Sequence, residues 1–202
     1  ELFWSLGVAA LSQCYSWRGL HVVAAINIVS TLNNVFNVSF ISFGSAIGII
    51  LSQTLGAGKK EEARKISMRL LWFSVFVIVL VGVLMVCCAP FFPRIYNTTD
   101  VIKALSTKIL FIIALFMPVQ AFNNSCYFTM RSGGKTMVTF IFDSGFMWGV
   151  SAVLAFCLSR FTAIPIELLF FSVQAVDIVK GVFGYILMRK GIWLNVVVSE
   201  DK

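Results

Sequence analysis

The chain has 202 residues, of which 59% are hydrophobic and 12% are charged, and its mean hydropathy is +0.92. A soluble domain carries about twice that charged fraction, so this composition excludes a soluble enzyme and favours an all-α integral membrane protein. The formal net charge of +7 does not indicate nucleic-acid binding, because the basic residues are scattered over short segments and form no contiguous patch.

Apolar stretches long enough to cross a bilayer recur along the chain. A spanning helix needs about 20 mostly apolar residues. Six transmembrane helices are predicted, at approximately residues 1–18, 22–56, 66–93, 104–130, 136–159 and 163–188. The second range is nearly long enough for two spans, but it contains no proline and no turn cluster before Gly44. A single long helix, bent or straight, is therefore predicted there.

The sequence contains no motif of an enzyme or of a metal site. Its five cysteines lie within apolar stretches without the paired spacing of zinc or redox sites, and its one histidine, His21, lies beside a predicted loop. Neither a nucleophile motif nor a phosphate-binding glycine loop is present. We therefore expect no catalytic residue, no bound metal and no cofactor.

The chain begins at Glu1, inside an apolar segment that lacks the basic leader and cleavage site of a signal peptide. A truncated polypeptide is the expectation.

Basic residues in short loops are retained on the cytoplasmic side of a membrane. Ten of them fall on one side of the predicted bundle and four on the other, which predicts a multi-pass protein of the cell membrane with a cytoplasmic carboxy terminus. The ten are Lys59, Lys60, Arg64, Lys65, Arg69, Arg131, Lys135, Arg189, Lys190 and Lys202, and the four are Arg18, Arg94, Lys103 and Arg160.

Acidic residues within membrane spans cost about 3 kcal/mol each on insertion scales, and each is a functional candidate. Three qualify: Glu1, Asp143 and Asp177. Asp143 has no basic residue closer in sequence than Lys135, and its carboxylate is suited to taking up a proton or a small cation in an antiporter, or to a structural hydrogen bond. Asp177 has Lys180 three residues later, a spacing that favours a neutralised structural pair. The role of Glu1 depends on residues that precede it.

Polar residues in the second and fourth predicted helices are candidates for a substrate cavity. In the second helix they recur every three or four residues and draw one stripe. The stripe either lines a solvated pathway or supplies hydrogen bonds between helices. It comprises Asn27, Ser30, Thr31, Asn34, Asn37, Ser45 and Ser52. In the fourth helix Pro118 precedes Gln120, Asn123, Asn124 and Ser125, which predicts a bend and a cavity wall there.

Several segments together resemble one known family. The most specific is Gln53-Thr-Leu-Gly-Ala-Gly-Lys-Lys-Glu-Glu-Ala-Arg64, supported by the turn Arg131-Ser-Gly-Gly-Lys-Thr136. Asp143 with Trp148, the run Gln174–Lys180 and the ending Arg189-Lys-Gly-Ile-Trp193 agree with it. These segments resemble the multidrug and toxic compound extrusion family, and specifically the second of its two six-helix lobes.

The resemblance implies a two-lobe, twelve-helix transporter that expels organic, often cationic compounds in exchange for protons or sodium ions. This chain would supply residues 1–202 of its carboxy-terminal lobe, with the amino-terminal lobe missing. Glu1 resembles the family's acidic position on the seventh helix, which is linked to ion coupling. Better-known branches also have an acid on the tenth helix, where the nearest residue here is Gln120.

The leading hypothesis is a cation-coupled antiporter that works by alternating access. Its candidate coupling residues are Glu1, Asp143 and Asp177, and its candidate cavity residues are Asn27, Asn34, Gln120, Asn123 and Asn124. The expected partners are a small organic substrate, membrane lipid and the missing lobe, with no nucleic acid. Two alternatives stay open: a flippase for lipid-linked saccharides from the same superfamily, and a membrane scaffold that transports nothing.

Overall fold

The computed structural model describes residues 2–194 of the chain, and these form an all-helical bundle. Six helical rods follow one another, in agreement with the six predicted helices. The first four are α1 (Leu2–Ser16), α2 (Leu20–Gly56), α3 (Lys60–Cys88) and α4 (Asp100–Ser132), with a short 3-10 turn, η1 (Phe92–Ile95), before α4. The fifth rod is composed of α5 (Thr136–Phe140), the π-helical segments η2 (Ile141–Gly145) and η3 (Met147–Ala152), and α6 (Val153–Phe161). The sixth is α7 (Ile166–Arg189).

Four rods in the described part of the chain are long and apolar enough to cross a membrane: α2, α3, α4 and the rod from Thr136 to Phe161. The described part of α1 has 15 residues, which is shorter than a full span. α7 has 24 residues but carries Asp177 and Lys180 near its middle, which lowers its apolar character. Those two charges need polar partners within the lobe, because lipid offers none.

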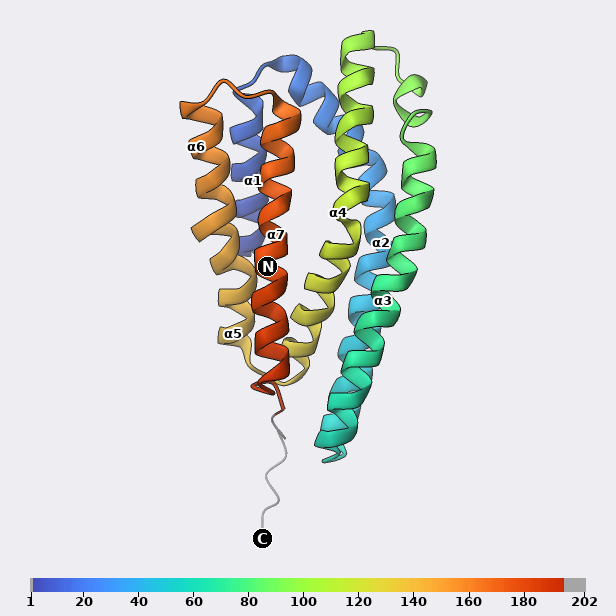
Figure 1. Ribbon diagram of the computed structural model, residues 1–202, viewed down its shortest axis with the longest axis vertical. Helices are drawn as coiled ribbons and strands as arrows, with labels where there is room; N and C mark the ends of the chain where they lie inside the picture. Colours follow the sequence, from blue (N-terminus) through green and yellow to red (C-terminus); the bar gives the residue numbers. More distant parts are fainter. Residues whose placement is uncertain (1, 195–202) are drawn as a thin grey trace.

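The rods form two groups that meet at α4. α1, α7 and the fifth rod lie together on one side, and α2 and α3 lie with α4 on the other (Figure 1). α4 packs against α2, α3 and α7, so it joins the two groups. A buried apolar core that includes Ile109, Leu110 and Met117 of α4 accounts for this central position.

The long second helix is confirmed, because α2 runs for 37 residues without a break. It ends before Gly58, whose positive φ of 75° suits glycine at a helix terminus. α3 and α4 begin earlier than the predicted starts at residues 66 and 104. Their first turns contain Glu61, Glu62 and Asp100, acids that stabilise the positive end of the helix dipole but end an apolar window.

α4 changes direction near its middle, where the sequence has Pro118 (Figure 1). A proline inside a helix removes one backbone hydrogen bond and clashes with the carbonyl one turn earlier, which kinks the helix. The bend carries the second half of α4 toward α7 and α5. The residues that follow Pro118 are thereby placed between the two groups of helices.

Arg18, in the turn between α1 and α2, caps the carboxy-terminal end of the fifth rod. Its Nη2 donates hydrogen bonds to the carbonyl oxygens of Leu158, at 2.9 Å, and Thr162, at 2.6 Å. A cation here satisfies carbonyls at the negative end of a helix. We expect Arg18→Met to lower the free energy of unfolding by about 1–2 kcal/mol in a thermal denaturation assay. Arg160→Met, at an exposed arginine on the same rod, is the control and should change it by less than about 0.5 kcal/mol.

Candidate functional site

An ion pair inside the lobe joins the fifth rod to α7. Lys180 Nζ donates to Asp143 Oδ1 at 2.7 Å, and the two side chains are only 13% and 23% exposed. The same ammonium lies 5.2 Å from the centroid of the Phe142 ring, within cation–π range. An intramembrane carboxylate is thus held next to a base and an aromatic face, away from lipid.

This pairing corrects one prediction from the sequence. Asp143 has no base near it in sequence, and Lys180 was expected to pair with Asp177 on its own helix. The structure places the ammonium against Asp143 of η2 instead. A neighbouring helix competes for a side chain as effectively as a residue three positions away, and the sequence contains no direct information about which helices are neighbours.

The backbone at Asp143 is π-helical. η2 and η3 are two consecutive wide-turn segments that separate α5 from α6, and Asp143 lies in the first of them. π-helical turns are rare and occur frequently at functional sites, because the extra residue per turn shifts the direction of the side chains. Phe142 and Ser144, which flank Asp143, are buried. The irregular backbone therefore coincides with the charged side chain.

Asp177 belongs to the same charged cluster although it does not hold the ammonium. It is half-buried on α7, three residues before Lys180, and its carboxylate interacts electrostatically with Lys180 and Asp143. Two carboxylates and one ammonium leave one negative charge in excess when all three are ionised. Asp143, Asp177 and Lys180 are called the charged cluster below.

Two amides of α4 connect helices at the level of the cluster. Asn123 is buried, and its Nδ2 donates to the backbone carbonyl of Asp177 at 2.9 Å. Within residues 2–194, its Oδ1 accepts no hydrogen bond. Asn124 Nδ2 donates to the backbone carbonyl of Phe40 in α2 at 2.8 Å. Both predicted cavity residues therefore hold α4 against its neighbours, and Gln120, one turn earlier, is half-buried.

The predicted polar stripe of α2 lies on the outside of this lobe. All seven of its members are exposed, from Asn27 and Asn34 to Ser52. Exposed apolar side chains such as Val35 and Val38 lie beside it on α2, whereas the outward faces of α3 and α7 are more uniformly apolar, for example at Phe76, Val79 and Phe183. Amides and hydroxyls are poorly accommodated by lipid tails, so the α2 face is suited to an aqueous path or to another protein surface. It is connected to the charged cluster through α4, which packs against both α2 and α7.

A hydrogen bond joins α1 to the fifth rod. Trp148 Nε1, in η3, donates to the backbone carbonyl of Phe3 at 2.9 Å.

Glu1, the third predicted coupling acid, lies outside the described residues. Residues 2–194 contain no group of three or more histidine, cysteine or acidic side chains able to hold a metal ion.

Sequence reasoning missed the part that Lys180 plays. An intramembrane base is as rare as an intramembrane acid, and that signal alone marks it as a functional candidate. The local spacing to Asp177 led instead to a structural pair. The π-helical turns of the fifth rod had no recognised sequence signal.

Comparison with known proteins shows which family has this architecture. The family model described as MatE matches residues 2–157. A solved structure described as "Reverse polarity of binding pocket suggests different function of a MOP superfamily transporter from Pyrococcus furiosus Vc1 (DSM3638)" is similar in fold, with a TM-score of 0.85 and 16% identity. The match covers 98% of this chain and 44% of that one, so the chain spans less than half of that transporter's length. No curated protein matches. The chain belongs to the MatE family, the multidrug and toxic compound extrusion transporters, and has the fold of one transporter lobe.

Proposed function

We propose that this lobe is half of a cation-coupled antiporter that exports organic, often cationic compounds in exchange for protons or sodium ions. The observation that carries the proposal is the charged cluster, in which one ammonium holds Asp143 while a second carboxylate, Asp177, lies three residues away on the same helix. The excess negative charge is a binding site for one proton or one small cation. Such a site has different occupancy on the two sides of an ion gradient, which is what coupling requires.

The proposed cycle uses a change of partner at Lys180. With the site empty, the ammonium holds Asp143, as observed at 2.7 Å. A proton or sodium ion that enters the cluster neutralises one carboxylate and leaves the ammonium to the other. That exchange alters the contact between η2 and α7, and the wide turns of η2 and η3 supply backbone that can adjust. Ion binding is thereby linked to the packing of the fifth rod.

The α2 stripe is the proposed substrate surface. The helix that carries it contains no charged residue from Leu20 to Gly56. The amides and hydroxyls of the stripe are exposed, and lipid tails offer them no hydrogen-bond partners. Neutral polar groups accept organic cations without an ion pair that would slow their release. A lipid-linked saccharide has phosphates that call for a basic surface, and this stripe contains no lysine or arginine, which favours the exporter over the flippase.

Ethidium efflux from proteoliposomes tests the exporter proposal. The full-length polypeptide that contains this chain is reconstituted, loaded vesicles are diluted, and a proton or a sodium gradient is imposed separately. We expect one of the two gradients to drive efflux well above the rate without a gradient. If folded protein moves ethidium under neither gradient, this substrate class is refuted. The flippase and the scaffold would then be the favoured hypotheses.

The α2 stripe gives a second prediction. We expect Asn34→Leu to reduce gradient-driven ethidium efflux by roughly tenfold, the equivalent of one lost polar contact of about 1.4 kcal/mol. Because Asn34 is exposed, the substitution should change the free energy of unfolding of the protein by less than about 0.5 kcal/mol. Phe76→Leu, on the apolar outer face of α3, is the matched control and should retain efflux. Full efflux in Asn34→Leu would remove the stripe from the transport path.

A further inference from the structure

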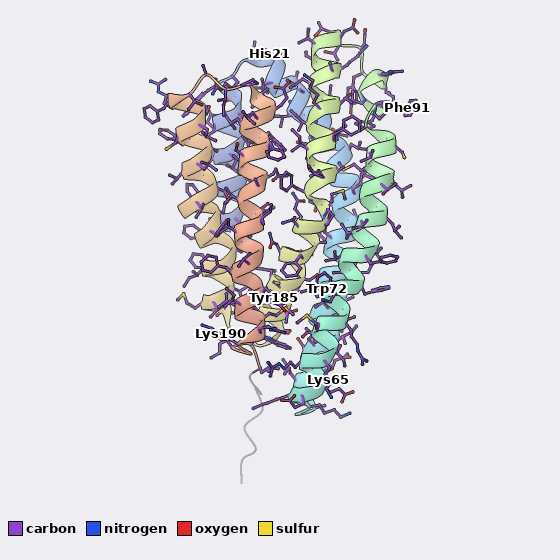
Figure 2. The ribbon with its side chains drawn as sticks, viewed as in Figure 1. His21, Lys65, Trp72, Phe91, Tyr185 and Lys190 are labelled. Atoms are coloured by element: carbon purple, nitrogen blue, oxygen red, sulfur yellow. The ribbon has the colours of Figure 1, made fainter. Side chains whose placement is uncertain are left out.

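A groove opens on the face of the lobe formed by α3, α4 and α7. Its volume is about 460 Å³, and its lining includes Trp72, Val75, Pro118, Phe122, Val182 and Tyr185. Trp72 of α3 and Tyr185 of α7 lie on its two sides (Figure 2). The groove is almost entirely apolar and contains no acid, so it is unsuited to the charged part of an organic cation.

The face that carries this groove is suited to lipid. Exposed side chains on the same two helices are large and apolar, for example Phe76 of α3 and Phe183 and Ile186 of α7. The polar stripe, by contrast, lies on α2 and contributes nothing to the groove. An apolar, grooved face on a membrane helix bundle is in contact with acyl chains.

A second pocket, of about 480 Å³, lies between α3 and α7 at the end where the basic loops gather. Three of its lining side chains are cations, Arg64, Lys65 and Arg189, and one is an acid, Glu61. Arg64 Nη2 donates to the backbone carbonyl of Arg189 at 3.1 Å, which holds the two helix ends together. The pocket thus has an excess of positive charge.

The two pockets are arranged end to end along the same pair of helices. On α3, Lys65 and Trp72 are seven residues apart, a rise of about 10 Å along the helix axis. On α7, Arg189 is one turn beyond Tyr185, and its Cζ lies 5.4 Å from the centroid of the Tyr185 ring. Figure 2 shows Lys65 and Lys190 near the same end of the bundle, beyond Trp72 and Tyr185. Tryptophan and tyrosine at this position are typical of the membrane–water interface.

We propose that the α3–α7 face binds one anionic phospholipid, with its phosphate in the basic pocket and an acyl chain in the apolar groove. Charge complementarity selects the headgroup, because basic pockets between transmembrane helices attract anionic lipid headgroups. The apolar groove then distinguishes a lipid from a soluble phosphate. This site is separate from the charged cluster and does not depend on the proposed exporter function.

Fluorescence quenching at Trp72 tests the proposal directly. The full-length polypeptide is reconstituted with phosphatidylglycerol or with phosphatidylcholine, each brominated on its acyl chains, at low mole fraction in unlabelled phosphatidylcholine. The Trp72 signal is the difference between this protein and its Trp72→Phe variant. We expect half-maximal quenching at a mole fraction of brominated phosphatidylglycerol at least roughly tenfold below that of brominated phosphatidylcholine. Equal quenching by both lipids would overturn the proposal, because it would show only unselective lipid contact.

Charge variants identify the headgroup contacts. Neutralising one basic residue near the surface weakens anionic lipid binding about fivefold, so Lys65→Gln with Arg189→Gln should raise the required mole fraction about 25-fold. Lys59→Gln with Lys60→Gln removes the same charge at the same end from positions that do not line the pocket, and should leave selectivity within about threefold. Equal loss in both double variants would overturn the assigned pocket. Addition of soluble glycerol phosphate should not displace the lipid, and displacement at millimolar concentration would assign the pocket to a soluble phosphate instead.

Discussion

Asp143→Asn is expected to abolish gradient-driven efflux and to destabilise the protein. The substitution preserves the shape of the side chain but leaves the Lys180 ammonium, only 13% exposed, without its carboxylate. Breaking a fully buried ion pair costs about 3–5 kcal/mol. Because Asp143 is 23% exposed and Asp177 is nearby, we expect a smaller loss, about 2 kcal/mol, measured by thermal unfolding of the purified full-length protein.

A double variant separates the two effects. Asp143→Asn with Lys180→Met also removes the ammonium that lost its partner and leaves the half-buried Asp177 as the one charge of the cluster, so stability should return to within about 1 kcal/mol of the original protein. Efflux should stay lost, because the proposed cycle needs Lys180 to change partner between two carboxylates, and the double variant has neither the ammonium nor Asp143. Glu167→Gln is the matched control: it breaks the exposed Lys108–Glu167 pair, with atoms 3.0 Å apart, and should cost less than about 1 kcal/mol. Efflux retained by the double variant would show that the pair is only structural.

Gly133→Ala is expected to disturb the end of α4 where Trp193 packs. Gly133 is buried and has φ of −83°, a backbone conformation that alanine adopts freely, so any cost is steric. A methyl group there would overlap the backbone carbonyl of Trp193. That carbonyl cannot rotate away as a side chain would, and the indole of Trp193 is itself fixed by a 3.1 Å hydrogen bond from Nε1 to the carbonyl of Met188.

Overpacking of this kind costs about 1–3 kcal/mol, and we expect Gly133→Ala to lower thermal stability by that amount. Gly149→Ala serves as the control, since a methyl group at Gly149 meets no atom within 4 Å. Its stability should change by less than about 0.5 kcal/mol. If the two alanine variants unfold at the same temperature, the close contact between Gly133 and Trp193 is not a feature of the folded protein in solution.

The helices of this lobe could be predicted because the bilayer restricts the alternatives. Each span must satisfy its backbone internally and needs about 20 apolar residues, so composition alone locates α2, α3 and α4. The same rule fails at the edges. The first turns of α3 and α4 are amphipathic, with Glu61 and Asp100 facing water, and an apolar window does not include them.

The candidate site could be predicted only as a set of unusual residues. Asp143 and Asp177 were recognisable because charge is costly in a membrane. Their arrangement was not, since Lys180 could pair with Asp177 on its own helix or with an acid on a neighbouring helix, and only helix packing decides between them. Asn123 and Asn124 likewise looked alike in sequence, yet one contacts α7 and the other α2. A one-residue step along a helix turns a side chain by about 100°, enough to change its neighbour.

Coupling between the ion at the charged cluster and the substrate on the α2 stripe is tested most directly by ion release. Ethidium is added to the purified full-length protein in weakly buffered detergent solution, and protons or radioactive sodium set free are measured. We expect about one ion to be released per protein, and none from Asp143→Asn with Asp177→Asn, because the excess negative charge is then absent. Release that persists in this double variant would place coupling outside the charged cluster and contradict its proposed role.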